Sequence, residues 1–218
     1  ADAAMFDAKT RGRAQWRVFD EDLAAQATER LELTTDLREA LARDELEVRY
    51  QPVVDLGTGD LVGLEALTRW HHPIRGWVPP SQFVPLAEES GLSSALDRWV
   101  LARACRDAAK LRLCGALPLS ARMAVNISAP SLSDPGLVQR VRDSASAAQL
   151  PLDALELEVT ETSLLADAES ARLALAALSE LGVGIALDDF GTGYSSLTHL
   201  RQFPVTTIKI DLGFVQHV

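Results

Sequence analysis

The chain has 218 residues, of which 47% are hydrophobic and 24% charged, and its formal net charge is −10. This composition excludes a disordered chain, and the acidity argues against a protein that coats a nucleic-acid polymer, because such a protein needs a basic surface. The apolar runs are far shorter than the roughly 18 to 20 residues that cross a bilayer. We therefore expect a cytoplasmic location, either free or as the cytoplasmic part of a longer, membrane-anchored protein.

The first 44 residues differ in pattern from the rest of the chain. Residues 1–20 predict a short amphipathic helix and an extended tail. Residues 21–44 carry leucines and alanines at helical spacing among dense charges, which predicts a connector helix that packs on the domain after it. We place the main boundary near residue 21 and a single larger domain over residues 45–218.

Beyond residue 45, short runs rich in Val, Ile and Leu alternate with stretches of helical period. This alternation of apolar strands and helices is typical of parallel βα units covered by helices, and it fits either a barrel or an open doubly wound sheet. The predicted strands are 46–54, 61–68, 122–127, 154–160, 183–187 and 206–210. The predicted helices are 80–89, 95–113, 131–149, 168–181 and 194–202.

Polar side chains lie in or at the ends of most of these strands. An open sheet concentrates its ligand residues at one switch point, whereas a barrel brings the ends of all its strands around one mouth. Because nearly every strand contributes a polar residue, the sequence favours an α/β barrel. The residues concerned are Glu65, Asn126, Glu158, Glu161, Asp188, Asp189, Lys209 and Asp211.

These side chains are mainly oxygen donors. Carboxylates and an Asn amide suit one or two Mg²⁺ or Mn²⁺ ions, and the lack of His and Cys at the strand ends disfavours zinc. The adjacent pair Asp188-Asp189 would repel each other unless a cation bridged them. Two metal ions about 3.5 to 4 Å apart could clamp a phosphodiester and activate a water molecule.

Ordered motifs extend this pattern. The segment 63–70 reads GLEALTRW and is followed by His72-Pro73, with Tyr50-Gln51-Pro52 before it. Further along come VNIS at 125–128, ELEVTET at 156–162, DDFGTGYSS at 188–196 and KID at 209–211. Seven blocks in this order closely resemble the EAL family of cyclic-di-GMP phosphodiesterases.

The resemblance implies the hydrolysis of cyclic-di-GMP to linear pGpG on a TIM-like (β/α) barrel whose first strand is antiparallel to the others. It also implies a homodimer formed through this domain. Asp189 would serve a second metal ion and the nucleophilic water, and Lys209 would contact that water or the scissile phosphate, as a base or as an electrostatic anchor. The first metal ion would be held by Glu65, Asn126, Glu158 and Asp188.

The remaining implied roles concern the substrate and a loop. Gln51, Arg69 and Asp211 would bind substrate, with the planar guanidinium of Arg69 on a phosphate. Glu161 would brace the loop 188–196. A catalytically silent receptor for cyclic-di-GMP, or a protein-interaction domain of the same family, is the alternative function.

Both ends of the chain carry expectations from the resemblance. The segments AMFDAK at 4–9 and Gly12-Arg13 resemble the closing pattern of a GGDEF diguanylate cyclase domain, so we expect such a domain upstream. The family continues past the sixth predicted strand with two further βα units. We therefore expect a partial barrel that needs these units, or a partner chain, to cover its unpaired strand edges before it is active.

Overall fold

A computed structural model describes residues 21–43, 45–191 and 201–214. One mixed sheet forms its centre, with the strand order β1-β2-β4-β5-β6-β7 and the short β3 paired to the outer part of β2. The strands are β1 Leu46–Val54, β2 Leu61–His72, β3 Gly76–Val78, β4 Arg122–Asn126, β5 Leu155–Thr160, β6 Gly184–Phe190 and β7 Thr207–Ile210.

The direction of the strands matches the expected barrel. β1 pairs with β2 in antiparallel fashion, and β2, β4, β5, β6 and β7 follow one another in parallel. The parallel α/β architecture and the antiparallel first strand are thus confirmed. Within the described residues the sheet is an open curve, since β1 and β7 form its two edges.

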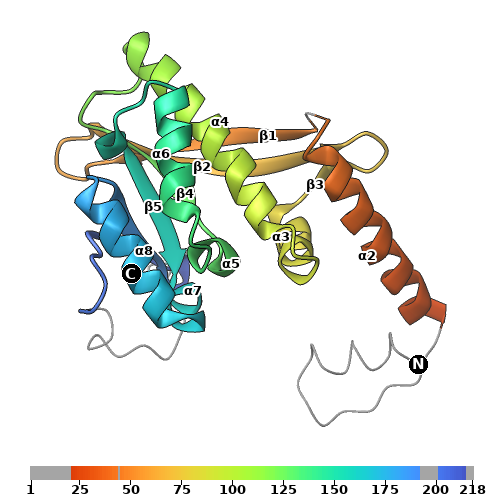
Figure 1. Ribbon diagram of the computed structural model, residues 1–218. Helices are drawn as coiled ribbons and strands as arrows, with labels where there is room; N and C mark the ends of the chain where they lie inside the picture. Colours follow the sequence, from red (N-terminus) through yellow and green to blue (C-terminus); the bar gives the residue numbers. More distant parts are fainter. Residues whose placement is uncertain (1–20, 44, 192–200, 215–218) are drawn as a thin grey trace.

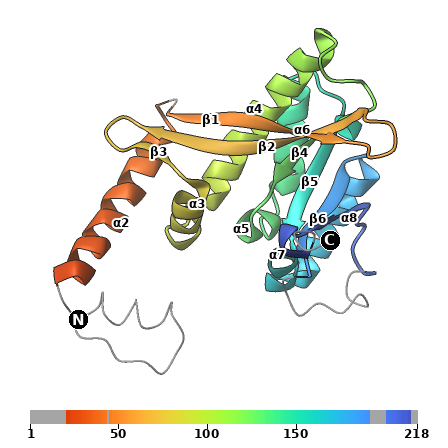
Figure 2. The same ribbon diagram turned by 180° about the vertical axis from the view of Figure 1, so that it is seen from behind.

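Helices cover one face of this sheet. In Figure 1 the helices α4, α6 and α8 lie in front of the strands, and Figure 2 shows the sheet from behind with the same helices beyond it. Helix α2 lies at the far end of the β1–β2 ribbon, next to α3, in both views. The helices are α2 Glu21–Ala40, α3 Pro80–Glu89, α4 Ser93–Leu113, α5 Ala129–Leu132, α6 Leu137–Ala147, α7 Glu161–Ala166 and α8 Ala168–Glu180.

Successive side chains of each strand point to opposite faces of the sheet, and this alternation separates the core from the site. Side chains of one parity face the helices and are fully buried, as Val125, Leu157 and Leu187 are. Side chains of the other parity face the concave side of the sheet. The parallel register aligns this second set across strands, because Glu65 pairs with Ala124, Asn126 with Glu158, and Glu158 with Ala186.

The structure differs from the predicted elements in three places. Strand β3 was missed because three residues are too few to show a period, and its pairing extends β2 beyond Thr68 to His72. The single predicted helix over 131–149 is wrong, since the Pro135-Gly136 pair separates α5 from α6. A short helix, α7, follows β5 directly, and the hydroxyl of Thr160 caps it by accepting the Ser163 N–H at 3.2 Å.

Some expectations fall outside the described residues. Residues 1–20, with the proposed cyclase tail, and most of the predicted helix over 194–202 belong to this group. In the part of the chain that the structure describes, no helix has both the length and the apolarity to span a bilayer.

Candidate metal centre and adjoining pocket

Four charged side chains from four strands meet on the concave side of the sheet. The ammonium nitrogen of Lys209 (β7) donates to carboxylate oxygens of Glu158 (β5) at 2.7 Å, Glu65 (β2) at 3.0 Å and Asp188 (β6) at 3.2 Å. One carboxylate oxygen from each acid lies within 4.8 Å of the others. Residues 144 positions apart in the sequence are therefore brought to one point by the register of the parallel strands.

Asn126, at the end of β4, joins this cluster from the side. Its amide nitrogen donates to Oε1 of Glu65 at 3.2 Å, and its Cα lies opposite Glu158 in the sheet. All four residues expected to hold the first metal ion are thus on one face of the sheet, and Lys209 is with them.

Burial determines the electrostatics of the cluster. The side chain of Glu158 is only 2% exposed, and burial raises the pKa of its carboxyl to about 7, with the charges of Glu65 and Asp188 adding to the increase and Lys209 opposing it. Burial by itself lowers the pKa of Lys209, but its hydrogen bonds to Glu158 and Glu65 outweigh burial and raise that pKa above its ordinary value. Three acids and one base leave the group short of positive charge.

The donor set fits a hard divalent cation. Three carboxylates and an amide provide oxygen ligands of the kind that Mg²⁺ and Mn²⁺ prefer, and the carboxylates already converge on a cationic atom, the ammonium nitrogen of Lys209. Such a convergence of acids would be unfavourable without positive charge between them. These residues have the donor atoms to hold a divalent metal ion.

Asp189 and Asp211 lie beside the cluster rather than in it. Asp189 has a left-handed backbone with φ 55°, and its N–H donates to Oδ1 of Asp188 at 3.0 Å. Partial burial and the nearby charges of Asp188 and Asp211 raise the pKa of the Asp189 carboxyl. The Asp211 carboxylate accepts the Gly213 N–H at 2.8 Å. Neither residue belongs to the three-carboxylate group among the described residues.

Glu161 is the first residue of α7 and is 5% exposed. It follows β5 as expected, but in a helix rather than at the strand end. Most of the loop 188–196 that it is predicted to brace lies outside the described residues.

Gln51 and Arg69 share the concave face with Glu65. Gln51 lies directly opposite Glu65 in the β1–β2 ladder, and Arg69 is four residues beyond Glu65 on the same side of β2. The guanidinium of Arg69 donates to its neighbour's carbonyl, Thr68 O, at 2.9 Å.

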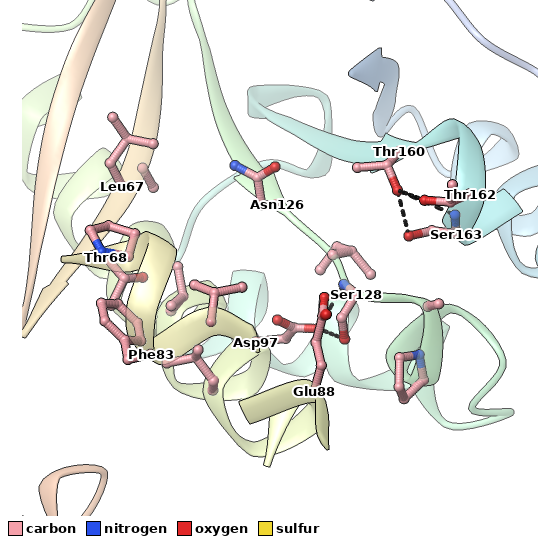
Figure 3. Close-up of a pocket in the computed structure, with 18 of the residues that line it drawn as sticks. Leu67, Thr68, Phe83, Glu88, Asp97, Asn126, Ser128, Thr160, Thr162 and Ser163 are labelled. Atoms are coloured by element: carbon pink, nitrogen blue, oxygen red, sulfur yellow. Dashed lines mark hydrogen bonds between the residues drawn. The ribbon is translucent and has the colours of Figure 1, made fainter. Parts of the chain in front are cut away.

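A cavity of about 650 Å³ opens next to Asn126. Figure 3 shows Asp97 on one side of this pocket, hydrogen-bonded to Ser128, and the hydroxyls of Thr160, Thr162 and Ser163 on another side. Its lining comes from the second half of β2, helices α3 and α4, the end of β4 with the segment after it, and the end of β5 with the start of α7.

Asp97 is a residue that the sequence did not reveal. It lies on α4, where one acid among many on a helix gives no signal. One of its oxygens, Oδ2, accepts both the backbone N–H and the hydroxyl of Ser128, at 2.9 and 2.6 Å. Burial nevertheless raises the pKa of its carboxyl, although these hydrogen bonds oppose the increase. A carboxylate held this firmly in a cavity wall is suited to recognise a hydrogen-bond donor.

Comparison with known proteins identifies the family of the chain. The model of the EAL domain family matches residues 34–218, so the chain belongs to the EAL domain family. The chain is 44% identical, over its whole length, to the bifunctional diguanylate cyclase/cyclic di-GMP phosphodiesterase MucR of Pseudomonas aeruginosa, and covers 32% of that protein. It is 41% identical over its whole length to the cyclic di-GMP phosphodiesterase PdeR of Escherichia coli, and also covers 32% of that protein.

Solved structures show the same relationship. A complex of the P. aeruginosa MucR phosphodiesterase with c-di-GMP has a TM-score of 0.79 at 45% identity, over 85% of this chain and 74% of that one. The EAL domain of FimX from P. aeruginosa, bound to c-di-GMP, has a TM-score of 0.75 at 30% identity, over 85% and 73% of the two chains. The chain spans about a third of the length of the curated relatives named above.

Proposed function

We propose that this protein hydrolyses cyclic-di-GMP to linear pGpG with Mg²⁺ or Mn²⁺ at the cluster of Glu65, Asn126, Glu158 and Asp188. The observation that carries the proposal is the convergence of three carboxylates from three strands on one cationic atom, beside a pocket. Relatives named as cyclic di-GMP phosphodiesterases and a solved c-di-GMP complex support the choice of substrate.

Each residue has a separate task in this proposal. Glu65, Asn126, Glu158 and Asp188 would hold the first cation, and Asp189 would serve a second cation and orient the attacking water. A divalent cation bound there supplies a Lewis acid that polarises the phosphodiester and lowers the pKa of a water molecule. Lys209, with three N–H donors at the centre of the cluster, holds the attacking water or a non-bridging oxygen of the scissile phosphate.

The substrate extends from the cluster over the concave face. Arg69 presents a planar fork of donors to a phosphate, and Gln51 supports the sugar-phosphate ring from β1. Asp211 holds the substrate at the opposite side, beside Asp189. The position of Gln51 opposite Glu65, and of Arg69 farther along the same strand as Glu65, supports these proposals.

The pocket beside Asn126 suits a nucleobase. Its volume of about 650 Å³ accommodates a purine, and its wall combines apolar side chains with the anchored Asp97 carboxylate. A guanine carries N–H donors on one edge, and Oδ1 of Asp97, the carboxylate oxygen that Ser128 does not contact, can accept one of them. We assign Asp97 to this edge of one guanine.

Turnover with purified full-length protein tests the proposal. Incubation with cyclic-di-GMP and Mn²⁺ or Mg²⁺ should yield pGpG, and Glu65→Ala should reduce turnover at least about 100-fold, because it removes a ligand of the cation. Glu169→Ala changes an exposed carboxylate on α8 and serves as the matched control. Binding of cyclic-di-GMP without turnover in either metal would instead favour the silent receptor.

The other predictions drawn from the resemblance stay open. A homodimer through this domain, a cyclase domain upstream of residue 21 and a cytoplasmic location are predictions that the described residues do not address. The name of the bifunctional relative, which matches all 218 residues, supports the cyclase domain as a proposal.

A further inference from the structure

Helix α2 is docked on the domain by a narrow apolar seam with a polar rim. Leu33, Leu37 and Ala40 are at most 1% exposed and join the main core. Around this seam, Arg75 contacts Glu29 at 2.7 Å and Glu32 at 2.9 Å, Arg30 pairs with Glu89 of α3, and Asp36 contacts His72 at 3.1 Å. The helix is thus tied both to the end of β2 and to α3.

His72 is fixed from two sides. Its Nδ1 accepts the backbone N–H groups of Ile74 and Arg75, both at 3.1 Å. Because a backbone N–H can only donate, Nδ1 is unprotonated, so Nε2 carries a proton and donates it to Asp36. The ring is 5% exposed and has no other orientation that keeps these three hydrogen bonds.

An aromatic series leads from His72 to the pocket. Trp70, which is fully buried, contacts the His72 ring edge-on at 5.5 Å between centroids and the Phe83 ring edge-on at 5.9 Å. Phe83 lies on α3 and is one of the residues that line the pocket, where Figure 3 shows it beside Thr68. The Asp36 carboxylate of α2 is therefore linked to the pocket by three packed rings.

Helix α3 gives a second link. Glu89, the partner of Arg30, directly follows Glu88, which lines the pocket together with Val84 of the same helix. α3 has ten residues and contains Pro85, which removes a backbone N–H from its interior. A short helix with a missing hydrogen bond depends on its neighbours for its position, and α2 is one of those neighbours.

We propose that α2 is a control helix for the substrate pocket: when docked, it holds Phe83 and α3 in place through His72 and Trp70, and its displacement weakens substrate binding. The inference rests on the proposed function, because it names the pocket of that function as the element controlled. Asp36 and His72 are positioning residues, since they act through Phe83 and do not contact substrate.

Steady-state kinetics of the full-length protein with cyclic-di-GMP test this proposal. Asp36→Ala should raise KM by roughly 3- to 10-fold with kcat within about twofold, because the pocket wall loosens while the carboxylate cluster is untouched. Asp36→Asn keeps an oxygen that accepts the His72 proton and should restore most of the affinity. Glu39→Ala, which changes an exposed pair with Arg43 on the same helix, is the control and should leave KM unchanged.

A double-mutant cycle separates a link through Phe83 from a general loss of stability. The KM effects of Asp36→Ala and Phe83→Leu should be less than multiplicative in the double variant, because both act on the same wall. Multiplicative effects, a fall in kcat alone, or a KM unchanged by Asp36→Ala would overturn the proposal.

Hydrogen exchange gives a readout that does not depend on catalysis. In Asp36→Ala, the backbone amides of α3 should exchange faster than in the wild type, while those of α8 should keep their rate. Unchanged exchange in α3 would contradict the control role. Absence of turnover in the wild type, with this exchange pattern intact, would instead refute only the proposed function.

Discussion

Two groups of acidic and basic side chains in this molecule differ chiefly in burial. At the concave face, Glu158, Glu65, Asp188 and Lys209 have side chains that are 2 to 27% exposed. Where α2 meets the turn between β2 and β3, Arg75 of the turn and its partners Glu29 and Glu32 on α2 are 31 to 60% exposed. Desolvation of a buried charge costs several kcal/mol, whereas an exposed pair contributes about 0 to 1 kcal/mol. A cluster of buried acids with too few bases is costly to fold, and this cost points to a ligand.

The largest expected effect is the loss of Lys209. In Lys209→Met without divalent ions, the free energy of unfolding should fall by about 3 to 5 kcal/mol at pH 8, because three carboxylates lose the cationic partner that they share. Addition of Mn²⁺ should restore much of the lost free energy of unfolding. Urea denaturation measures the free energy of unfolding with Mn²⁺ and with a chelator. Arg75→Met, at the exposed cluster, is the comparison, and equal losses in the two variants would contradict the contrast in burial.

The pH dependence of the metal-free protein should be large as well. The carboxyl of Glu158 has a folded-state pKa of about 7 and an ordinary value of 4.5, so between these values the folded state binds more protons than the unfolded state. The contribution of Glu158 to the free energy of unfolding is fully present below pH 4.5. It is lost as pH rises to about 7, and the total loss is roughly 3 kcal/mol.

Glu158→Gln should remove this decrease. Denaturation curves at a series of pH values, recorded in chelator, compare the two proteins. Because a cation competes with the proton, Mn²⁺ affinity of the wild type should increase over the same range. An affinity that is independent of pH between about 5 and 8 would argue against Glu158 as a ligand.

A smaller effect is expected at the pocket. Asp97→Asn should raise KM for cyclic-di-GMP by roughly 10- to 100-fold, because the amide carries no charge and a hydrogen bond to a charged group contributes about 1.5 to 3 kcal/mol. The preference over the corresponding adenine dinucleotide should shrink in parallel. Competition binding with the two dinucleotides measures the ratio of their affinities. An unchanged ratio in Asp97→Asn would show that Asp97 does not recognise the base.

The smallest effect is expected on the rim of α2. Glu32→Ala removes one of two carboxylates that contact Arg75 and should change the free energy of unfolding by less than about 0.5 kcal/mol. The same denaturation assay, repeated at high salt, checks that even this difference is screened. A loss above about 2 kcal/mol would mean that exposed pairs on α2 behave like the buried cluster.

The sequence predicted the concave face well because that face depends on strand periodicity. The six long strands came from runs of apolar residues, and the polar positions at their ends met because parallel register aligns alternate residues. The antiparallel first strand was not visible in the periodicity and came only from the family resemblance. Lys209 and Glu65, 144 residues apart, needed the fold to show their contact.

Local and tertiary features escaped prediction for different reasons. Strand β3 and helix α7 are too short to show a period, and both depend on the elements beside them. Asp97 gave no signal because its hydrogen-bond partner, Ser128, lies 31 residues away in the sequence. The strand β4 brings Ser128 next to α4. The link from Asp36 to Phe83 is equally invisible, since it runs through packing between three separate elements.

The location of the cation is the most direct test of the central claim. Crystals of the protein with Mn²⁺ and cyclic-di-GMP should show an anomalous-scattering peak in contact with carboxylate oxygens of Glu65, Glu158 and Asp188 and with the Asn126 amide oxygen, with Lys209 moved toward a phosphate. A bound dinucleotide with no anomalous peak at these side chains, or a peak held by other residues, would contradict the account.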